Sequence, residues 1–262
     1  MDTGQVRGLS DSVVGEVAEI SLLGNRQENQ DRVKVVVADD TVLLIAIDGM
    51  GGHANGARAA ELAVESIEQA FLRETHPLFD PQGFLHRAIG RAHAAVVELG
   101  AGISVEKRPR ATCALCLVQD GMTYWGHVGD SRVYHLRGQR VKERTRDHSH
   151  VEVLMYDGVI TAEESASHPM RNYVECCLGG DSELPRMSIT RSKPLESRDV
   201  LLVCSDGFWS PLPENQLARL GTADGPLNKQ LQTLAGLATR AAAPHSDNTS
   251  AAAMSYIDAS SV

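Results

Sequence analysis

Two apolar segments that are far apart in the chain end in the same way. Residues 42–49 read VLLIAIDG and residues 200–207 read VLLVCSDG. Continuous apolar runs of this kind predict strands that are buried on both faces. Asp-Gly after such a run is most often a tight turn, which is the simplest interpretation of either segment alone. Together they place Asp48 and Asp206 at the ends of two core strands. If these strands are neighbours in the packed core, both carboxylates lie at the same edge of that core.

Three further aspartates occur at similar positions. Asp31 opens a strand pattern, Asp130 follows YWGHVG, and Asp247 precedes the last strand pattern. If these strands are neighbours, five carboxylates converge beside a packed core, where their repulsion is costly unless cations or protons neutralise it. A donor set of oxygen atoms, without a His/Cys cluster, favours magnesium or manganese over zinc. Taken singly, each aspartate is more often a cap or turn residue.

The rest of the chain alternates strand and helix patterns. Strands are expected over residues 16–23, 31–39, 42–48, 111–119, 122–129, 132–138, 200–206 and 249–257. We expect the first three to form one sheet, and the short connections at 119–121 and 129–131 to join antiparallel neighbours. Helices are expected from Asn55, from Pro81, after Pro213 and from about Leu227. Residues 147–180 mix short helical pieces with loop signals, which predicts a surface subdomain.

Composition limits the class of protein. The 262 residues, 42% of them hydrophobic, can bury one sizeable core, so we expect a single domain over residues 1–262. A formal charge of −9 and a pI near 5.6 argue against a nucleic-acid or anionic-membrane surface. No apolar stretch approaches the roughly 20 residues that cross a bilayer, and the first residues lack an apolar signal core, so we expect the cytoplasm. The five cysteines are expected to be buried free thiols.

Seven motifs, in this order, resemble those of one family. They are GNRQENQDR (24–32), AIDGMGGH (46–53), ATCALCLV (111–118), HVGDSRVY (127–134), DHS with DGVITAEESASHPMRN (147–172), LLVCSDGFW (201–209) and SDNTS (246–250). Together they are similar to the metal-dependent protein phosphatases, the type 2C serine/threonine phosphatases, in their bacterial branch. The resemblance covers nearly the whole chain. It implies an α+β fold, a four-layer α-β-β-α sandwich with two central antiparallel β-sheets flanked by helical pairs, and a flap subdomain over about residues 147–180.

The resemblance also implies a metal centre. Asp48 resembles the carboxylate that bridges two metals, and Gly49 resembles the residue whose carbonyl binds the second. Asp206 and Asp247 resemble the ligands that complete the first, and Asp31 resembles a ligand that acts directly or through water. Two manganese or magnesium ions are therefore expected.

Other positions have expected roles around that centre. Asp130 resembles a ligand of the third metal found in bacterial members. Arg26 resembles the arginine that binds the substrate phosphate, and the alternative is a surface arginine paired with Glu28. Met50 stands where related phosphatases often have a histidine, so the acid that protonates the leaving group is either His53 or a metal-bound water. His53 fits a helix cap or a packing role equally well. Solvated or capping roles are expected for three flap histidines, His148, His150 and His168.

The reaction implied by the resemblance is hydrolysis of phosphoserine and phosphothreonine in proteins. A water or hydroxide that bridges two metals would attack the phosphorus in line, without a protein nucleophile. A thiol phosphatase is excluded because no cysteine lies in a glycine-rich phosphate loop that ends in arginine. Two alternatives remain, a catalytically silent regulatory module and a hydrolase of small phosphoesters; retention of Asp48, Asp206 and Asp247 disfavours the first. The expected partners are phosphoproteins phosphorylated by a serine/threonine kinase, and the expected state is a monomer.

Overall fold

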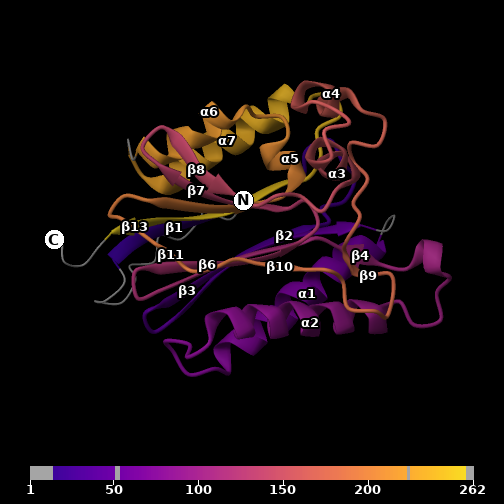
Figure 1. Ribbon diagram of the computed structural model, residues 1–262, viewed down its shortest axis with the longest axis horizontal. Helices are drawn as coiled ribbons and strands as arrows, with labels where there is room; N and C mark the ends of the chain where they lie inside the picture. Colours follow the sequence, from indigo (N-terminus) through magenta and orange to yellow (C-terminus); the bar gives the residue numbers. More distant parts are fainter. Residues whose placement is uncertain (1–13, 51–53, 223–224, 258–262) are drawn as a thin grey trace.

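Two antiparallel β-sheets lie face to face, and helices cover both outer faces. The computed structural model describes residues 14–50, 54–222 and 225–257. Figure 1 shows the four layers, with α1 and α2 below one sheet and α7 above the other. The predicted four-layer α-β-β-α sandwich is confirmed by this arrangement.

The five-stranded sheet, called here the β12 sheet, contains β1 (Val14–Leu22), β13 (Thr249–Ile257), β12 (Val200–Cys204), β7 (Arg132–Arg137) and β8 (Arg140–Arg144), in that order. The eight-stranded sheet, called the β3 sheet, has the order β10 (Ser188–Ile189), β6 (Met122–Val128), β5 (Cys113–Gln119), β3 (Thr41–Met50), β4 (Arg110–Ala111) and β9 (Leu178–Gly179). Its other two strands are β2 (Asp31–Ala38), which pairs with β3, and β11 (Lys193–Pro194), which pairs with β6.

Helices α1 (Ala54–Leu72) and α2 (Pro81–Leu99) form the pair that covers the β3 sheet. The outer layer on the β12 sheet is one long helix, α7 (Leu227–Ala241), with the short helices α5 (Asp206–Trp209) and α6 (Glu214–Leu217). Two 3-10 segments, η1 (Val105–Lys107) and η2 (Ala218–Thr222), lie in the connections. The predicted start of α2 is confirmed, because the Asp80 carboxylate accepts a hydrogen bond from the amide of Gly83 (2.9 Å) and Pro81 is the first helical residue.

The two apolar segments of the opening analysis are the central strands of the two sheets. In β3, Leu43 and Ile45 pack toward α1 and α2, whereas Val42 and Leu44 face the other sheet. Strand β12 is buried on both faces in the same way. Fully burying a side chain of this size stabilises the fold by about 1.5–3 kcal/mol. Both strands therefore have fixed positions in the core, and so do the residues that follow them.

The first three strands do not form one sheet, contrary to expectation. Strand β1 pairs along its full length with β13 in the β12 sheet, whereas β2 and β3 form a hairpin in the β3 sheet. The turn between β2 and β3 is tight, with Asp39 at φ 47°. The connection from β1 to β2 spans residues 23–30, which is long enough to cross the roughly 10 Å between packed sheets.

The connection over residues 129–131 also differs from its prediction. Asp120 and Gly121, with φ of 51° and 65°, form the predicted hairpin turn between β5 and β6. Gly129, with φ of 96°, instead leads the chain from β6 in the β3 sheet to β7 in the β12 sheet. Asp130 therefore lies at the passage between the two sheets and not in a hairpin turn.

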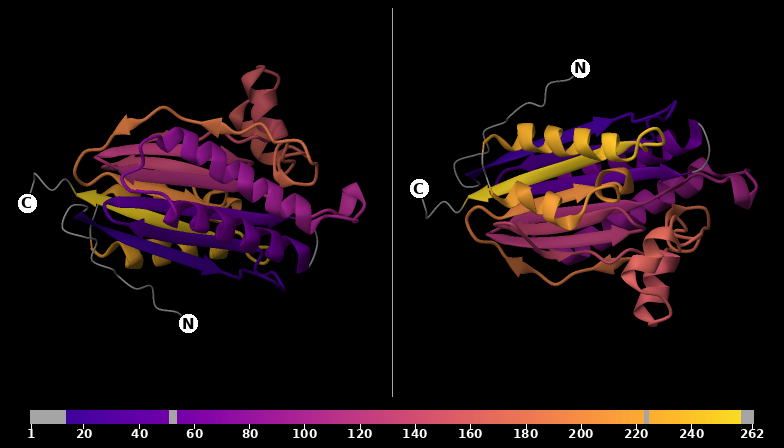
Figure 2. Two further views of the ribbon diagram at one scale, coloured as in Figure 1. Left: turned by 90° about the horizontal axis from the view of Figure 1, so that it is seen from below. Right: turned by 90° about the horizontal axis from the view of Figure 1, so that it is seen from above.

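The segment predicted as a flap forms two short helices outside the sandwich. These are α3 (His150–Tyr156) and α4 (Ala162–Ser167), and Figure 2 shows them projecting beyond the sheets. Each begins with a side-chain cap, Ser149 for α3 and Thr161 for α4. Several short strands were not predicted, namely β4, β8, β9, β10 and β11. Within the described ranges, no helix combines the length and apolar character needed to span a membrane.

Candidate active site

The β2–β3 hairpin brings the first two aspartates together. Asp31 at the start of β2 is directly opposite Asp48 near the end of β3. Opposite residues of an antiparallel pair point to the same face, so both carboxylates lie on one side of the β3 sheet. The amide of Asp48 donates to Oγ1 of Thr112 (3.2 Å), and the Asp48 carbonyl accepts from the amide of Thr112 (2.8 Å). These bonds fix the end of β3.

The third aspartate comes from the other sheet. Asp206 is the first residue of α5 and directly follows Ser205, the N-cap residue that lies between the end of β12 at Cys204 and this helix. Oγ of Ser205 donates to Oδ2 of Asp31 (2.7 Å), and the Ser205 amide donates to the carbonyl of Ser250 on β13. Ser205 thus links the two sheets at the edge where the carboxylates lie. The sequence analysis did not single it out.

Asp247 and Arg26 complete this edge from two loops. Nη2 of Arg26 donates to Oδ2 of Asp247 (2.7 Å), so the partner of Arg26 is Asp247 and not Glu28. Asn248 fixes the same wall, because its Oδ1 accepts from the amide of Gln30 (2.8 Å). The Arg26 side chain is 58% exposed, which leaves it free to reach a bound ligand.

Gly49 is needed at its position because two backbone segments approach it closely. A Cβ atom there would collide with the carbonyl of Gly56 in α1 and would lie 2.9 Å from the carbonyl of Gln30. The Gly49 amide donates to that Gln30 carbonyl (3.1 Å). The bare backbone next to Asp48 is therefore explained by packing, independently of any ligand.

The electrostatics of this edge are those of crowded carboxylates. Burial raises the pKa of Asp31 to about 6 and that of Asp130 to about 7. Burial, followed by repulsion from Asp31 and Asp206, raises the pKa of Asp48 well above its ordinary value. Burial, followed by repulsion from Asp130 and Asp247, does the same for Asp206. The five predicted aspartates are thus close enough to repel one another, and their full ionisation requires compensating positive charge.

This donor set fits hard divalent cations. Within residues 14–50, 54–222 and 225–257, no three carboxylate, imidazole or thiol groups form a ready-made cage around one ion. Magnesium is usually bound by one or two carboxylates and keeps several waters, so spaced carboxylates at a solvent-facing edge suit it. Oxygen ligands suit manganese equally. Asp48 and Asp206 are half-buried residues, so neither position is sealed from solvent, although burial of the carboxylates is enough to raise their pKa values.

Comparison with known proteins decides the family. The protein phosphatase 2C family matches residues 21–242 of the chain. The chain belongs to the protein phosphatase 2C family. It is therefore a serine/threonine protein phosphatase, a hydrolase that acts on phosphoproteins. The resemblance indicated by the seven motifs is confirmed.

The alignments with individual relatives span most of this phosphatase and most of each relative. Protein phosphatase PhpP of Streptococcus pneumoniae is 30% identical over 230 residues, which are 85% of this chain and 92% of PhpP. The serine/threonine phosphatase of S. agalactiae superposes with a TM-score of 0.84 and 28% identity, over 93% of this chain and 99% of that one. The catalytic domain of the serine threonine protein phosphatase PstP, solved in complex with two manganese ions, has a TM-score of 0.76 and 26% identity, over 94% of this chain and 100% of its own.

His148 differs from its predicted solvated or capping role. It is 6% exposed and stacks on His127, with ring centroids 4.5 Å apart. Its Nδ1 accepts from the amide of Gly129 (3.3 Å), and its Nε2 bonds to Oγ of Ser188 (2.9 Å). Since Nδ1 acts as an acceptor, the ring is neutral, and burial lowers its pKa to about 4. His148 therefore holds the turn that contains Asp130 and the base of the flap.

A charged network supports the same turn from the β12 sheet. Arg132 donates from Nε and Nη2 to both carboxylate oxygens of Asp147 (2.7 Å each), and its guanidinium lies 3.2 Å from the ring centre of Trp209. Nε1 of Trp209 donates to the carbonyl of Asp130 (3.0 Å). The flap base, the Asp130 turn and helix α5 are thus joined through one arginine. None of these partners could be paired from sequence spacing.

The remaining predicted residues have simpler outcomes. His53, the candidate acid, lies outside the described residues. His168 caps a turn by accepting from the amide of Met170 (3.2 Å), and His150 pairs with Glu175 (2.9 Å), so the capping prediction holds for His168.

The thiols take no part in this edge. All five cysteines are free, and three of them, Cys113, Cys116 and Cys204, are buried. Burial raises the pKa of Cys116 to about 12 and raises those of Cys113 and Cys204 as well, which suppresses the nucleophilic thiolate. Cys176 and Cys177 are only half-buried, so the prediction of burial fails for these two.

Proposed function

We propose that the carboxylate edge is the active centre at which this phosphatase hydrolyses phosphoserine and phosphothreonine in proteins. The observation that carries the proposal is the convergence of five aspartates from both sheets. Burial and mutual repulsion raise the pKa values of four of them, Asp31, Asp48, Asp130 and Asp206. Such a site costs folding free energy unless positive charge compensates it. A fold that retains it is best explained by a function that uses cations.

Two or three manganese or magnesium ions would be held by the predicted ligands. Asp48, the carbonyl of Gly49, Asp206 and Asp247 would bind the first two ions, and Asp31 would contribute directly or through water. Asp130 would contribute to the third. When bound, these ions would lower the pKa of a water molecule and neutralise the phosphoryl oxygens.

The chain itself would supply orientation and charge. Arg26 would leave Asp247 and bind the phosphate with its planar guanidinium, a geometry that lysine cannot offer. Ser205 would keep the Asp31 carboxylate in place by donating its hydroxyl hydrogen. The Gly129–Asp130 turn would be held by His148 and Trp209. The proton for the leaving serine or threonine would come from His53 or from a bound water.

We further propose that residues 1–262 act as one catalytic domain, with residues 147–180 as the flap that contributes to substrate choice. Five free thiols are typical of a reducing compartment, so we propose action in the cytoplasm, as a monomer. The substrates would be proteins phosphorylated by a serine/threonine kinase.

The test is a panel of phosphoserine and phosphothreonine peptides, assayed for phosphate release beside small phosphoesters. The metal-free protein, prepared with EDTA, should release no phosphate, and manganese or magnesium should restore release. Zinc and calcium should restore it poorly, because their preferred coordination differs. A preference for small phosphoesters over every peptide would favour the alternative hydrolase, and full activity without metal would contradict the proposal.

A further inference from the structure

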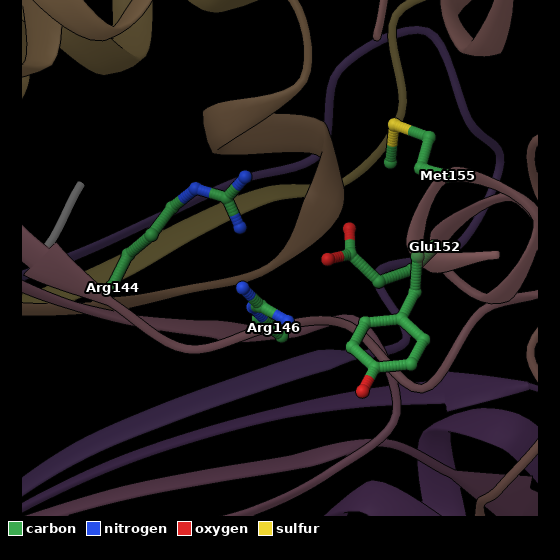
Figure 3. A pocket seen from close by; sticks show the side chains of 5 residues that line it. Arg144, Arg146, Glu152 and Met155 are labelled. Atoms are coloured by element: carbon green, nitrogen blue, oxygen red, sulfur yellow. The ribbon is translucent and has the colours of Figure 1, made fainter. Parts of the chain in front are cut away.

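An open hollow of about 500 Å³ lies between the edge of the β12 sheet and the flap. Arg144, at the end of β8, and Arg146, just beyond it, line one wall, and Glu152, Met155 and Tyr156 of α3 line the other. Figure 3 shows both guanidinium groups reaching into the hollow, with the Glu152 carboxylate directed toward them from the flap. Residues of the sheet and of the flap thus face one another across a space that is open to solvent.

The two arginines differ in whether protein groups already pair with their guanidinium groups. Nε of Arg144 donates to Oε1 of Glu214 (2.9 Å), and its Nη1 donates to the carbonyl of Thr145 (2.9 Å). Arg146 is exposed, and its guanidinium carbon lies 5.9 Å from the ring centre of Tyr156. Among the described residues, no carboxylate forms an ion pair with Arg146, not even Glu152 across the hollow. Its planar set of donors is therefore available to a ligand.

The hollow adjoins the loop that supports the proposed active centre. The Arg146 carbonyl bonds to Nε2 of His127 (2.7 Å), and the next residue, Asp147, binds Arg132. Arg132 stacks on Trp209, which donates to the carbonyl of Asp130. The loop that lines the hollow is therefore bonded to the residues that hold Asp130 at the proposed active centre.

We propose that the hollow is a substrate subsite that binds one anionic side chain close to the phosphorylated residue of the substrate. Arginine binds carboxylate and phosphate groups through paired N–H bonds, so the anion can be an acidic side chain or a second phosphorylated residue. Met155 and Tyr156 provide apolar contact for the side-chain stem, and Tyr156 is 77% exposed before any ligand binds. The Glu152 carboxylate repels an anion in the hollow and therefore limits how strongly the arginines hold it. The subsite deepens the proposed protein phosphatase function and rests on it.

The experiment compares phosphothreonine peptides that carry glutamate, alanine or phosphoserine at each flanking position in turn. For wild type with manganese, kcat/KM should be roughly three- to tenfold higher for an acidic than for a neutral residue at one or more of these positions. Arg146→Ala should bring this ratio to about 1, whereas Glu152→Gln should raise it because it removes a competing anion. The matched control is Arg140→Ala, an exposed arginine at the start of β8 and away from the hollow, which should keep the wild-type ratio.

Each outcome has a distinct meaning. A gain for glutamate and phosphoserine alike identifies a carboxylate-accepting subsite, and a gain for phosphoserine alone identifies a second phosphate as the ligand. A ratio that is unchanged in Arg146→Ala, or one that falls equally in Arg140→Ala, overturns the subsite. If the wild type releases no phosphate from any peptide, the proposed function fails; fluorescence anisotropy of the same labelled peptides then judges the subsite without catalysis. Equal binding of acidic and neutral peptides to wild type overturns it in that assay.

Discussion

Replacing Asp31 by Asn should stabilise the metal-free protein at neutral and alkaline pH. Asp31 is 2% exposed, and burial raises its pKa from 3.8 to about 6. Since each pKa unit corresponds to about 1.4 kcal/mol, the ionised carboxylate costs the folded state about 3 kcal/mol. Asparagine keeps an oxygen that accepts from Oγ of Ser205 but carries no charge. The variant should therefore avoid this cost.

The pH dependence gives the sign of the effect. Well below pH 3.8, Asp31 is protonated in both the folded and the unfolded chain, so the substitution should be nearly neutral. As pH rises from 4 through about 6, the unfolded chain ionises first, and the wild type loses stability that the variant keeps. Above pH 6 the difference should level off at up to about 3 kcal/mol in favour of Asp31→Asn.

Urea unfolding followed by circular dichroism, in EDTA between pH 4.5 and 8, measures this difference. Asp157→Asn is the matched control, because Asp157 is an exposed aspartate at the end of α3 and should give little change at any pH. Saturating manganese should reduce or reverse the advantage of Asp31→Asn, because cations compensate the wild-type carboxylate. A difference that does not vary with pH, or a variant that is less stable at pH 8, would refute the argument from crowded carboxylates.

Other substitutions separate the roles at the site. Arg26→Ala should lower kcat/KM for a phosphopeptide about 10- to 100-fold, mostly through KM, because a charged hydrogen bond to phosphate is worth about 1.5–3 kcal/mol. A manganese titration of the same variant should match that of the wild type. A collapse of metal binding in this variant would remove Arg26 from the phosphate site. Asp206→Asn should lower phosphate release by orders of magnitude in steady-state assays while circular dichroism shows an intact fold. His148→Asn places an acceptor where Nδ1 accepts from the amide of Gly129, whereas His148→Gln places a polar group where Nε2 meets Ser188. If the ring acts by supporting the Asp130 turn, His148→Asn should retain a higher kcat than His148→Gln. Equal kcat in both would contradict that role.

The sequence predicted most of what depends on local pattern. The double apolar runs of β3 and β12 identified the central strands and the residues at their ends, because burial on both faces leaves a continuous apolar signal. The motifs alone predicted the layers and the family. Asp31 and Asp48 could be expected to meet because a tight hairpin connects their strands.

Pairings between distant segments could not be read from the sequence. The placement of β1 beside β13 depends on which sheet a connecting loop reaches, and residues 23–30 allow either sheet. His148 gave no signal, because a histidine in a polar stretch is compatible with solvent and with a buried acceptor role. Ser205 and Trp209 act through partners from other elements, so their contacts became evident only in the assembled fold.

Calorimetric titration of the metal-free protein with manganese, for wild type and Asp48→Asn, tests the central claim most directly. Asp48 is directly opposite Asp31 in the β2–β3 hairpin, and the other four aspartates all repel its carboxylate. Asp48 is therefore the central carboxylate of the proposed metal centre. We predict that the wild type binds at least two manganese ions per chain and that Asp48→Asn loses the tight binding while remaining folded. Identical titration curves for the two proteins would contradict the assignment of this carboxylate edge as the metal centre.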